Sequence, residues 1–481
     1  MMCAQANSQQ LAFPGAEGFG AYATGGRGGT VVHVTNLNAS GPGSLADAVS
    51  QPNRTVVFDV GGVIDITGQN LTIASNLTIA GQTAPGEGIT IYGGRVIMSN
   101  SSNVIMRYIR MRGSISMPED KCTLTMDYCD NVILDHCSIS WGRWDNVHIK
   151  DANNITYQNC IISEGIEPQR FGAITDGTRN WTISHCLWTN NKSRNPKMKC
   201  YLQYYNNVVY NYGIGIVGGH SAADNYQDVM NNYFITGPSS GSSNKYFDQW
   251  TETDHLYSTG NYTDDNRDGK LNGRLITDYN GATPMQQPNL KCQAPMNLEP
   301  AEDAFHAVME HAGASRVRDS HDLRIIEQLA SLGTKGAFIA NEQDVGGIGT
   351  LSGADAPADS DGDGMPDDWN DYLDNYYQVT ESKDAEIKLP RAELVPDFKV
   401  AISSDRGKEL SLQELYDQCS KSIVAIKGYQ DGVDGYYWGS GIILSEDGLI
   451  LTNTHVIENC DTASVTLFDN SSYDAALVGA D

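Results

Sequence analysis

The stretch "NVILDHCSISWG", residues 131–142, decides the fold because close variants of it return along the chain. Each variant begins at an asparagine, continues as a short apolar run and closes in glycine or polar residues. The intervals between the starting asparagines are 27, 28, 23, 26 and 26 residues, and the starts are Asn76, Asn103, Asn131, Asn154, Asn180 and Asn206. A period in this range indicates stacked units that bury their faces against one another. Units this short, without intervening helices, predict an all-β chain coiled as a parallel β-helix.

The composition agrees with a chain rich in strands and turns. It contains 49 glycines and 24 tyrosines, and few helix-forming runs precede residue 300. The 32 basic and 59 acidic side chains give a net charge of −27, which argues against a general nucleic-acid binder because no basic stripe can neutralise phosphates. No apolar run approaches the roughly 18 residues needed to span a bilayer.

Three of the repeats carry a cysteine at the same position, six residues after the starting asparagine: Cys137, Cys160 and Cys186. Equal register predicts one interior column of these side chains, on rungs about 4.8 Å apart. That spacing leaves a disulfide open, but we expect reduced thiols packed as small buried apolar groups. The recurring asparagines predict a ladder of side-chain amides at the turns.

A basic cluster stands out in this acidic chain. The stretch "NKSRNPKMK", residues 191–199, contains Lys192, Arg194, Lys197 and Lys199. An isolated run of this kind is usually a solvated turn. The alternative is a local site for an anion, because cations gathered in a cleft attract an anionic substrate even when the net charge opposes it.

Several motifs in the same order resemble a known family: "GPGSLADAV" (41–49), "RTVVFDVGGVIDI" (54–66), "NLTIAGQTAPGEGITI" (76–91), "NVILDHCSISWG" and "SRNPK" (193–197). Over residues 11–340 the chain resembles the pectate lyases of polysaccharide lyase family one, particularly bacterial gut types. The resemblance implies a right-handed parallel β-helix, in agreement with the repeat, over residues 11–300. It also implies a monomeric, calcium-assisted enzyme that cleaves pectate (polygalacturonate) by β-elimination.

The resemblance assigns roles to the basic cluster. Arg194 matches the family's catalytic base, and Lys199 matches an arginine that grips a substrate carboxylate, with loss of the bidentate geometry. Lys192 and Lys197 become further substrate-binding candidates, and Arg170 lies near the family's substrate-binding lysine. A guanidinium is normally charged in proteins. Two roles for Arg194 therefore stay open, a base that reacts as neutral guanidine or a carboxylate clamp.

The resemblance also implies a calcium site, with Glu119, Asp120 and Asp145 as candidate ligands. Two further positions where the family has acidic residues are Cys122 and Trp144 here. Calcium prefers several oxygen ligands, and a thiol is a poor substitute. Calcium then enters with the substrate carboxylates or binds weakly. The alternative is a catalytically weakened β-helix that binds acidic polysaccharide without cutting it.

The chain changes character after residue 300. Residues 301–345 have helical spacing and predict a helical cap on the β-helix. Residues 355–372 include "DSDGDGMPDDWN", which resembles thrombospondin type 3 repeats and predicts a calcium loop. Its candidate ligands are Asp359, Asp361, Asp363 and Asp367. Residues 373–408 are charged and unpatterned, as expected of a linker.

Both ends of the chain suggest further features. Residues 1–10 end in a small-x-small pattern, Ala4-Gln5-Ala6, as in the remnant of a signal peptide, and predict a secreted or periplasmic protein. In residues 409–481, "GSGIILSEDGLILTNTHVIENC" resembles the first barrel of HtrA-type serine proteases, with His455 at the catalytic base. The chain stops before a nucleophile, which predicts an incomplete trypsin-like barrel. A third reading is a protease whose remaining residues lie beyond Asp481.

Overall fold

The protein is described by a computed structural model. In its first part the described residues are 10–219, 223–241, 245–289, 292, 296–356 and 358–360. In its second part they are 422–430, 437–443, 448, 450–452, 457, 460–467 and 471–476. The chain divides into two compact units, Met1–Asn370 and Asp371–Asp481, and each unit is taken by itself.

Three sheets make up the first unit within its described residues. The 11-stranded sheet contains β1 (Thr30–Val34), β2 (Arg54–Phe58), β5 (Leu77–Ala80), β8 (Ser102–Arg107), β11 (Asp130–Asp135), β14 (Asn153–Gln158), β17 (Arg179–Ser184), β20 (Tyr201–Tyr205), β23 (Asn225–Met230), β26 (Asp254–Thr259) and β29 (Thr283–Pro284). The 8-stranded sheet contains β4 (Asn70–Thr72), β7 (Arg95–Ile97), β10 (Leu124–Thr125), β13 (Asp145–Lys150), β16 (Phe171–Asp176), β19 (Lys197–Lys199), β22 (Ile216–Val217) and β25 (Phe247–Asp248). The 10-stranded sheet contains β3 (Gly62–Asp65), β6 (Ile89–Tyr92), β9 (Ile109–Arg112), β12 (Ser138–Ser140), β15 (Ile161–Ser163), β18 (Leu187–Thr189), β21 (Val208–Tyr210), β24 (Tyr233–Ile235), β27 (Tyr262–Asp264) and β28 (Arg274–Leu275).

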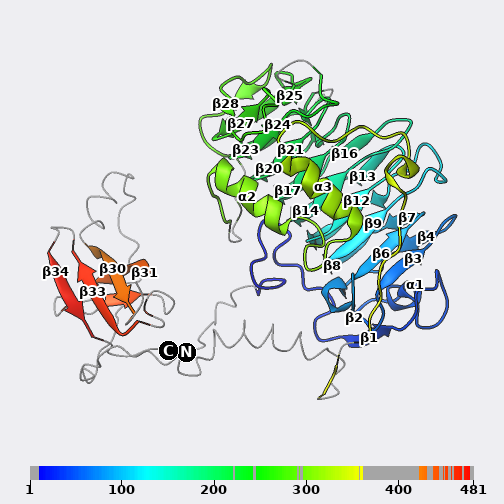
Figure 1. The fold of residues 1–481 in the computed structure, drawn as a ribbon, viewed down its shortest axis with the longest axis horizontal. Coiled ribbons are helices and arrows are strands. Elements are labelled where there is room, and N and C mark those ends of the chain that lie inside the picture. Colours follow the sequence, from blue (N-terminus) through cyan, green and yellow to red (C-terminus); the bar gives the residue numbers. More distant parts are fainter. Residues whose placement is uncertain are drawn as a thin grey trace. The chain divides into compact units, whose positions relative to one another are not determined.

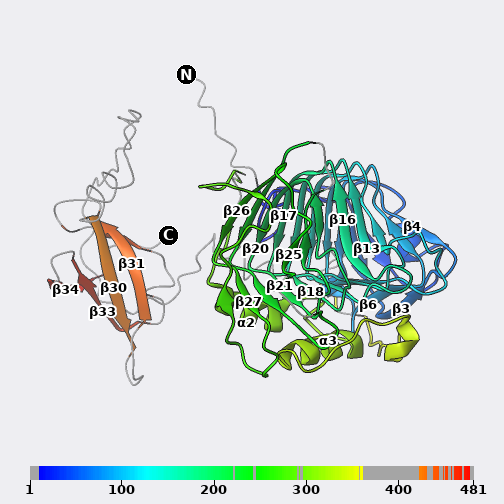
Figure 2. The same cartoon turned by 90° about the horizontal axis from the view of Figure 1, so that it is seen from above.

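From β2 to β27 the chain visits the three sheets in turn, so each full coil over this range contributes one strand to each sheet (Figures 1 and 2). Neighbouring coils pair in parallel, as in Val132 opposite Ile155 and Ile155 opposite Trp181. The inward side chains of all three sheets form one continuous apolar core. The structure confirms the parallel β-helix that the repeat predicts.

The recurring asparagines mark sharp bends in the coils. Asn103, Asn131, Asn154 and Asn180 have φ between 53° and 56°. Asparagine is one of the few residue types that tolerate this left-handed region. The side chains also bond from coil to coil, as in Asn180 Nδ2 to Asn154 Oδ1 at 3.1 Å. The predicted amide ladder is present at these bends.

The sixth repeat is out of register with the others, which corrects the prediction for Asn206. Trp181 pairs with Leu202, 21 residues on, whereas Ile155 pairs with Trp181, 26 residues on. The shorter coil places Tyr201, which directly precedes Leu202, at the level of Asn180. Asn206 instead follows β20 at the next bend, where its φ is also positive, 55°. Both bends favour asparagine, so spacing alone could not separate them.

The predicted cysteine column lies in the core. Cys137, Cys160 and Cys186 are fully buried and are free thiols, as expected. The Cys160 N–H donates to Cys186 Sγ at 3.3 Å. Burial raises the pKa of the Cys137 and Cys160 thiols well above the usual value, so both stay protonated.

Asparagines continue the same column in the later coils. Cys186 N–H donates to Asn207 Oδ1, Asn207 N–H to Asn232 Oδ1 and Asn232 N–H to Asn261 Oδ1, at 2.9, 2.8 and 3.0 Å. Each Nδ2 also donates to a carbonyl of the preceding coil. These fully buried amides are therefore satisfied, as buried polar groups must be.

Helices cover one flank of the β-helix. The described helices and turns are α1 (Leu45–Ala48), η1 (Gly81–Thr83), α2 (Ala301–His311), α3 (Ser320–Ala330) and η2 (Glu342–Val345). The helices predicted within 301–345 are present, but they pack on outward apolar side chains of the 10-stranded sheet rather than over an end. Outward residues such as Leu187, Val208 and Tyr233 on that face need this cover. None of the described helices is long and apolar enough to cross a membrane.

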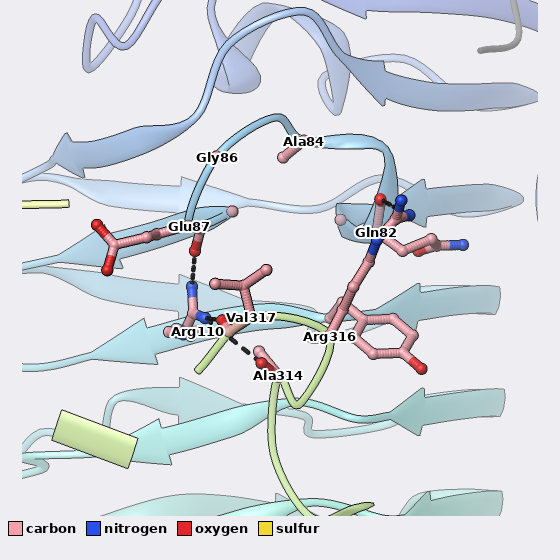
Figure 3. Close-up of a pocket in the computed structure, with 11 residues that line it drawn as sticks. Gln82, Ala84, Gly86, Glu87, Arg110, Ala314, Arg316 and Val317 are labelled. Carbon is pink, nitrogen blue, oxygen red and sulfur yellow. Dashed lines mark hydrogen bonds between the residues drawn. The ribbon is translucent and has the colours of Figure 1, made fainter. Parts of the chain in front are cut away.

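Buried arginines hold this helical segment to the sheet. Arg110, from β9, donates to the Glu87 carbonyl and to the carbonyls of Ala314 and Val317, so one guanidinium joins two coils to the segment between α2 and α3 (Figure 3). Arg112, on the same strand, pairs with Asp319 and Asp322 at 2.7 and 3.1 Å. These contacts occupy the guanidinium groups, and we assign them a structural role.

The described N-terminal segment follows the outer face of the 11-stranded sheet. Glu17 accepts a hydrogen bond from the Tyr205 hydroxyl at 2.8 Å, and its N–H donates to Gln158 Oε1. Burial raises the pKa of Glu17 to about 7. A titratable group therefore lies where the described N-terminal segment packs against the 11-stranded sheet.

The second unit contains a five-stranded antiparallel sheet in the order β32-β31-β30-β33-β34. Its strands are β30 (Ile423–Tyr429), β31 (Tyr437–Ile443), β32 (Ile450–Thr452), β33 (Thr462–Thr466) and β34 (Ser472–Ala475). Val424, Ile426 and Val465 form a small apolar cluster on it. His455, the proposed protease base, lies outside the described residues.

Candidate active site

The basic cluster lies in β19, a strand of the 8-stranded sheet, and in the loop just before it. Lys197 and Lys199 occupy alternate positions of β19, on either side of the buried Met198. Because side chains alternate along a strand, both lysines point outward from the core. Arg194 lies in the loop just before β19, with a φ of 62°, and Lys192 is exposed at the start of that loop. A left-handed φ is also found at the bends of the other coils, so here it marks a turn of the backbone.

Arg194 is paired with Asp145 from two coils away. Its Nη1 lies 3.1 Å from Asp145 Oδ1 and 2.9 Å from Oδ2. The carboxylate is fully buried, whereas 18 % of the arginine side chain is exposed. The guanidinium carbon also lies 4.2 Å from the ring centroid of Phe171, which belongs to the coil between them. The cation therefore has one face on protein and retains access to solvent.

Burial and neighbouring charges set the protonation of this cluster. Burial raises the pKa of Asp145 to about 6, although the charge and hydrogen bonds of Arg194 act against the rise. Burial, followed by the charges of Arg194 and Lys199, lowers the pKa of Lys197. Above pH 6 the site therefore contains an ionised Asp145 paired with Arg194 beside two further basic side chains.

Three buried asparagines form a chain of hydrogen bonds next to the Arg194–Asp145 pair. Asn146 Nδ2 donates to Asn191 Oδ1 at 3.1 Å, and Asn191 Nδ2 donates to Asn195 Oδ1 at 3.0 Å. Asn191 also accepts from Gly165 N–H and donates to a backbone carbonyl, so its amide is fully used. Asn146 follows Asp145 and Asn195 follows Arg194, so the network fixes the backbone beside both partners.

Sequence reasoning missed both this network and Phe171. Asn191 and Asn195 belong to a polar turn segment, where such residues are common for local reasons, and Asn146 is the second residue of β13. Their shared bonds depend on the stacking of three coils. The sequence signal that could have found them is the placement of Asn146 and Asn195 directly after the two charged candidates.

The other predicted substrate residues differ in their availability. Lys199 is half-buried opposite Asp176 on the neighbouring strand. Arg170 donates from Nε to the Ile339 carbonyl at 2.8 Å and from Nη2 to Glu167 at 2.6 Å. Arg170 therefore joins its loop to the segment around Ile339, and two of its nitrogens donate hydrogen bonds within the protein.

In this structure the candidate calcium ligands are engaged with basic side chains. Glu119 is paired with Arg143 at 3.3 Å, and Asp120 with Lys121 at 2.6 Å. Both oxygens of Asp145 are taken by Arg194. Across the residues that the structure describes, no group of three His, Cys, Asp or Glu side chains could hold a metal ion. These donors do not fit a resident calcium ion, so we route no chemical step through one.

The thiol at Cys122 reinforces this result. Burial, together with the charge of Asp145, raises its pKa to about 12, so it is protonated and a poor metal ligand. In the predicted calcium loop, Asp359 is exposed. Asp361, Asp363 and Asp367 lie outside the described residues.

Comparison with known proteins places this geometry in context. The chain is 45% identical to a probable pectate lyase C of Emericella nidulans over 74% of its own length and 85% of the relative's. A probable pectate lyase C of Aspergillus flavus is 44% identical, over 75% of this chain and 87% of the relative. These relatives are fungal, whereas the sequence motifs suggested bacterial types. No family model matches the chain.

Two further proteins are similar to smaller parts of the chain. A solved thermostable pectate lyase is 16% identical, with a TM-score of 0.48, over 64% of this chain and 99% of that structure. A segment of 43 residues is 51% identical to the serine endoprotease DegS of Haemophilus influenzae, covering 9% of this chain and 13% of DegS.

Proposed function

This chain belongs to the pectate lyase family, and we propose that it cleaves pectate by β-elimination at the cluster around Arg194. The observation that carries the proposal is the Arg194–Asp145 pair beside Lys197, at a solvent-accessible edge of an otherwise acidic protein. Pectate is a polyanion, and cations gathered at one place bind it despite the net charge.

The reaction breaks the C5–H and C4–O4 bonds of a galacturonate and moves one proton to the base. The base removes the proton on C5 of a galacturonate, the C4–O4 bond breaks, and a C4–C5 double bond forms. The departing oxygen takes a proton from solvent. Negative charge develops on the carboxylate next to C5, and positive groups placed beside it lower the barrier.

Arg194 is our candidate for the base, and Lys197 and Lys199 for the groups that hold carboxylates. Lys192, exposed in the same loop, is a further contact for the polymer. Arg194 must be a neutral guanidine at the moment of proton transfer, so we expect activity to rise towards alkaline pH. If it stays charged throughout, it acts instead as a clamp on the carboxylate, and the two roles differ in their pH profiles.

The test is the ultraviolet absorbance of the unsaturated product when the purified chain is incubated with polygalacturonate. Arg194→Ala should abolish the rise, whereas Arg274→Ala, in a surface ion pair with Asp265, should not change it. Parallel samples with calcium and with chelator reveal whether added metal contributes. Absence of product, with the polymer still bound, would favour the alternative of a binding protein.

We also propose that the chain is exported, because its polymeric substrate lies outside cells and Ala4-Gln5-Ala6 fits a signal-peptidase site. N-terminal sequencing of secreted material tests this proposal. A mature start after this site supports export, and intracellular retention of the chain with its N-terminus intact contradicts it.

A further inference from the structure

The side chain of Arg194 crosses a coil to reach its partner. Asp145 begins β13 and Phe171 begins β16, and the two are paired in register. Phe171 also bridges to Ser193, the residue before Arg194. Asp145, Phe171 and Arg194 thus belong to three successive coils, whose spacing in a sheet is about 4.8 Å per step. The guanidinium therefore passes over the level of the phenylalanine.

The ring of Phe171 occupies the space under this crossing. The guanidinium carbon lies 4.2 Å from the ring centroid, within the range in which a cation is attracted to an aromatic face. The ion pair holds one nitrogen of Arg194, Nη1. Without the ring, the guanidinium could pivot about that contact. With it, one face of the planar group rests on the ring, while 18 % of the arginine side chain stays exposed to solvent.

We propose that Phe171 is a positioning residue that sets the plane of the Arg194 guanidinium for the elimination. This inference rests on the function proposed above, but the contact itself does not depend on activity. Phe171 acts through Arg194. Its loss should therefore affect the chemical step more than the binding of the polymer.

Kinetics of three variants provide the first part of the test. Phe171→Leu removes the aromatic face, and we expect kcat to fall about ten-fold while KM changes less than about two-fold. Phe171→Tyr keeps the face and should recover most of kcat. Phe13→Leu is the matched control, because Phe13 makes an equivalent contact with Arg107, at 4.0 Å, elsewhere on the β-helix. It should leave kcat unchanged.

A second readout is independent of catalysis. In the full chain labelled with ¹⁵N-arginine, the Nε–H signal of Arg194, assigned with Arg194→Lys, should carry an upfield ring-current shift. The shift should disappear in Phe171→Leu and persist in Phe171→Tyr and Phe13→Leu.

The outcomes separate the two claims. A shift that persists in Phe171→Leu, an unchanged kcat, or an effect confined to KM would overturn the positioning role. If the parent chain forms no product, the proposed function fails. The ring-current shift then still decides whether Phe171 orients the guanidinium.

Discussion

Replacing Arg194 by alanine leaves the buried Asp145 carboxylate without its partner. Removing one member of a buried ion pair typically costs about 3–5 kcal/mol, because the remaining charge has lost its compensation. The carboxylate is fully buried in the parent protein, whereas the arginine side chain is 18 % exposed. The variant also loses the contact with Phe171, which contributes about 1 kcal/mol.

The destabilisation should depend on pH in a defined direction. The folded-state pKa of Asp145 is already raised from 3.8 to about 6, and without Arg194, which lowers it, it must rise further. A carboxyl group whose folded pKa lies above its unfolded value contributes stability at low pH and loses it as pH rises. The difference in the free energy of unfolding between the parent and Arg194→Ala should therefore be small near pH 4.5 and approach its full size near pH 8.5.

The double variant Arg194→Ala/Asp145→Asn separates stability from chemistry. Removing the carboxylate should recover all but about 1 kcal/mol of the loss and abolish its pH dependence. Lyase activity should stay about 10²–10⁴-fold below the parent in both variants, as expected when a group that transfers a proton is absent. Urea unfolding followed by tryptophan fluorescence at the two pH values, together with product absorbance, measures both effects. Equal stability of parent and Arg194→Ala at pH 8.5, or activity regained in the double variant, would refute this reasoning.

Three further predictions concern other parts of the protein. Lys197→Gln and Lys199→Gln should each raise the KM for polygalacturonate about ten-fold. The KM of each variant should also depend less on salt, which initial rates at two ionic strengths measure. An unchanged KM would exclude these lysines from the binding site. Glu17 has a folded pKa of about 7, so its ionisation destabilises the protein as pH rises through 7. Glu17→Gln, which can still accept the Tyr205 hydroxyl bond, should therefore raise the melting temperature at pH 9 but not at pH 4, and an equal shift at both would contradict the assignment. Asn232→Leu removes an amide that accepts two hydrogen bonds from Asn207 and donates to the Tyr204 carbonyl and to Asn261, so it should cost more than about 4 kcal/mol in urea unfolding; a loss below about 1 kcal/mol would mean the ladder contributes little.

The periodicity of the sequence predicts the coils well because each coil must bury the same face. It fails at Asn206, since two different bends in a coil both require a left-handed residue and both favour asparagine. The sequence also does not predict that α2 and α3 pack on the flank of the β-helix. This packing depends on outward apolar residues of the 10-stranded sheet, which in sequence look like residues of the core.

The site was predicted only in part for a related reason. Charge density alone finds Arg194 and its neighbouring lysines. The roles of Asp145 and Phe171 arise from register between coils about 25 residues apart in the sequence. An acidic residue near a basic cluster reads equally well as a metal ligand or as an ion-pair partner, and stacking decides between them.

The interior asparagine ladder joins the successive coils in the later half of the β-helix. The oxygen of Asn207, Asn232 and Asn261 in each case receives donors from the coil before it. One Nδ2 hydrogen of each returns to a carbonyl of that same earlier coil. Asn207 and Asn232 also donate their second Nδ2 hydrogen to the oxygen of the next asparagine in the ladder. Each of these two coils therefore needs both of its neighbours, and deleting or inserting one coil would leave buried amide groups unsatisfied on both sides of the change.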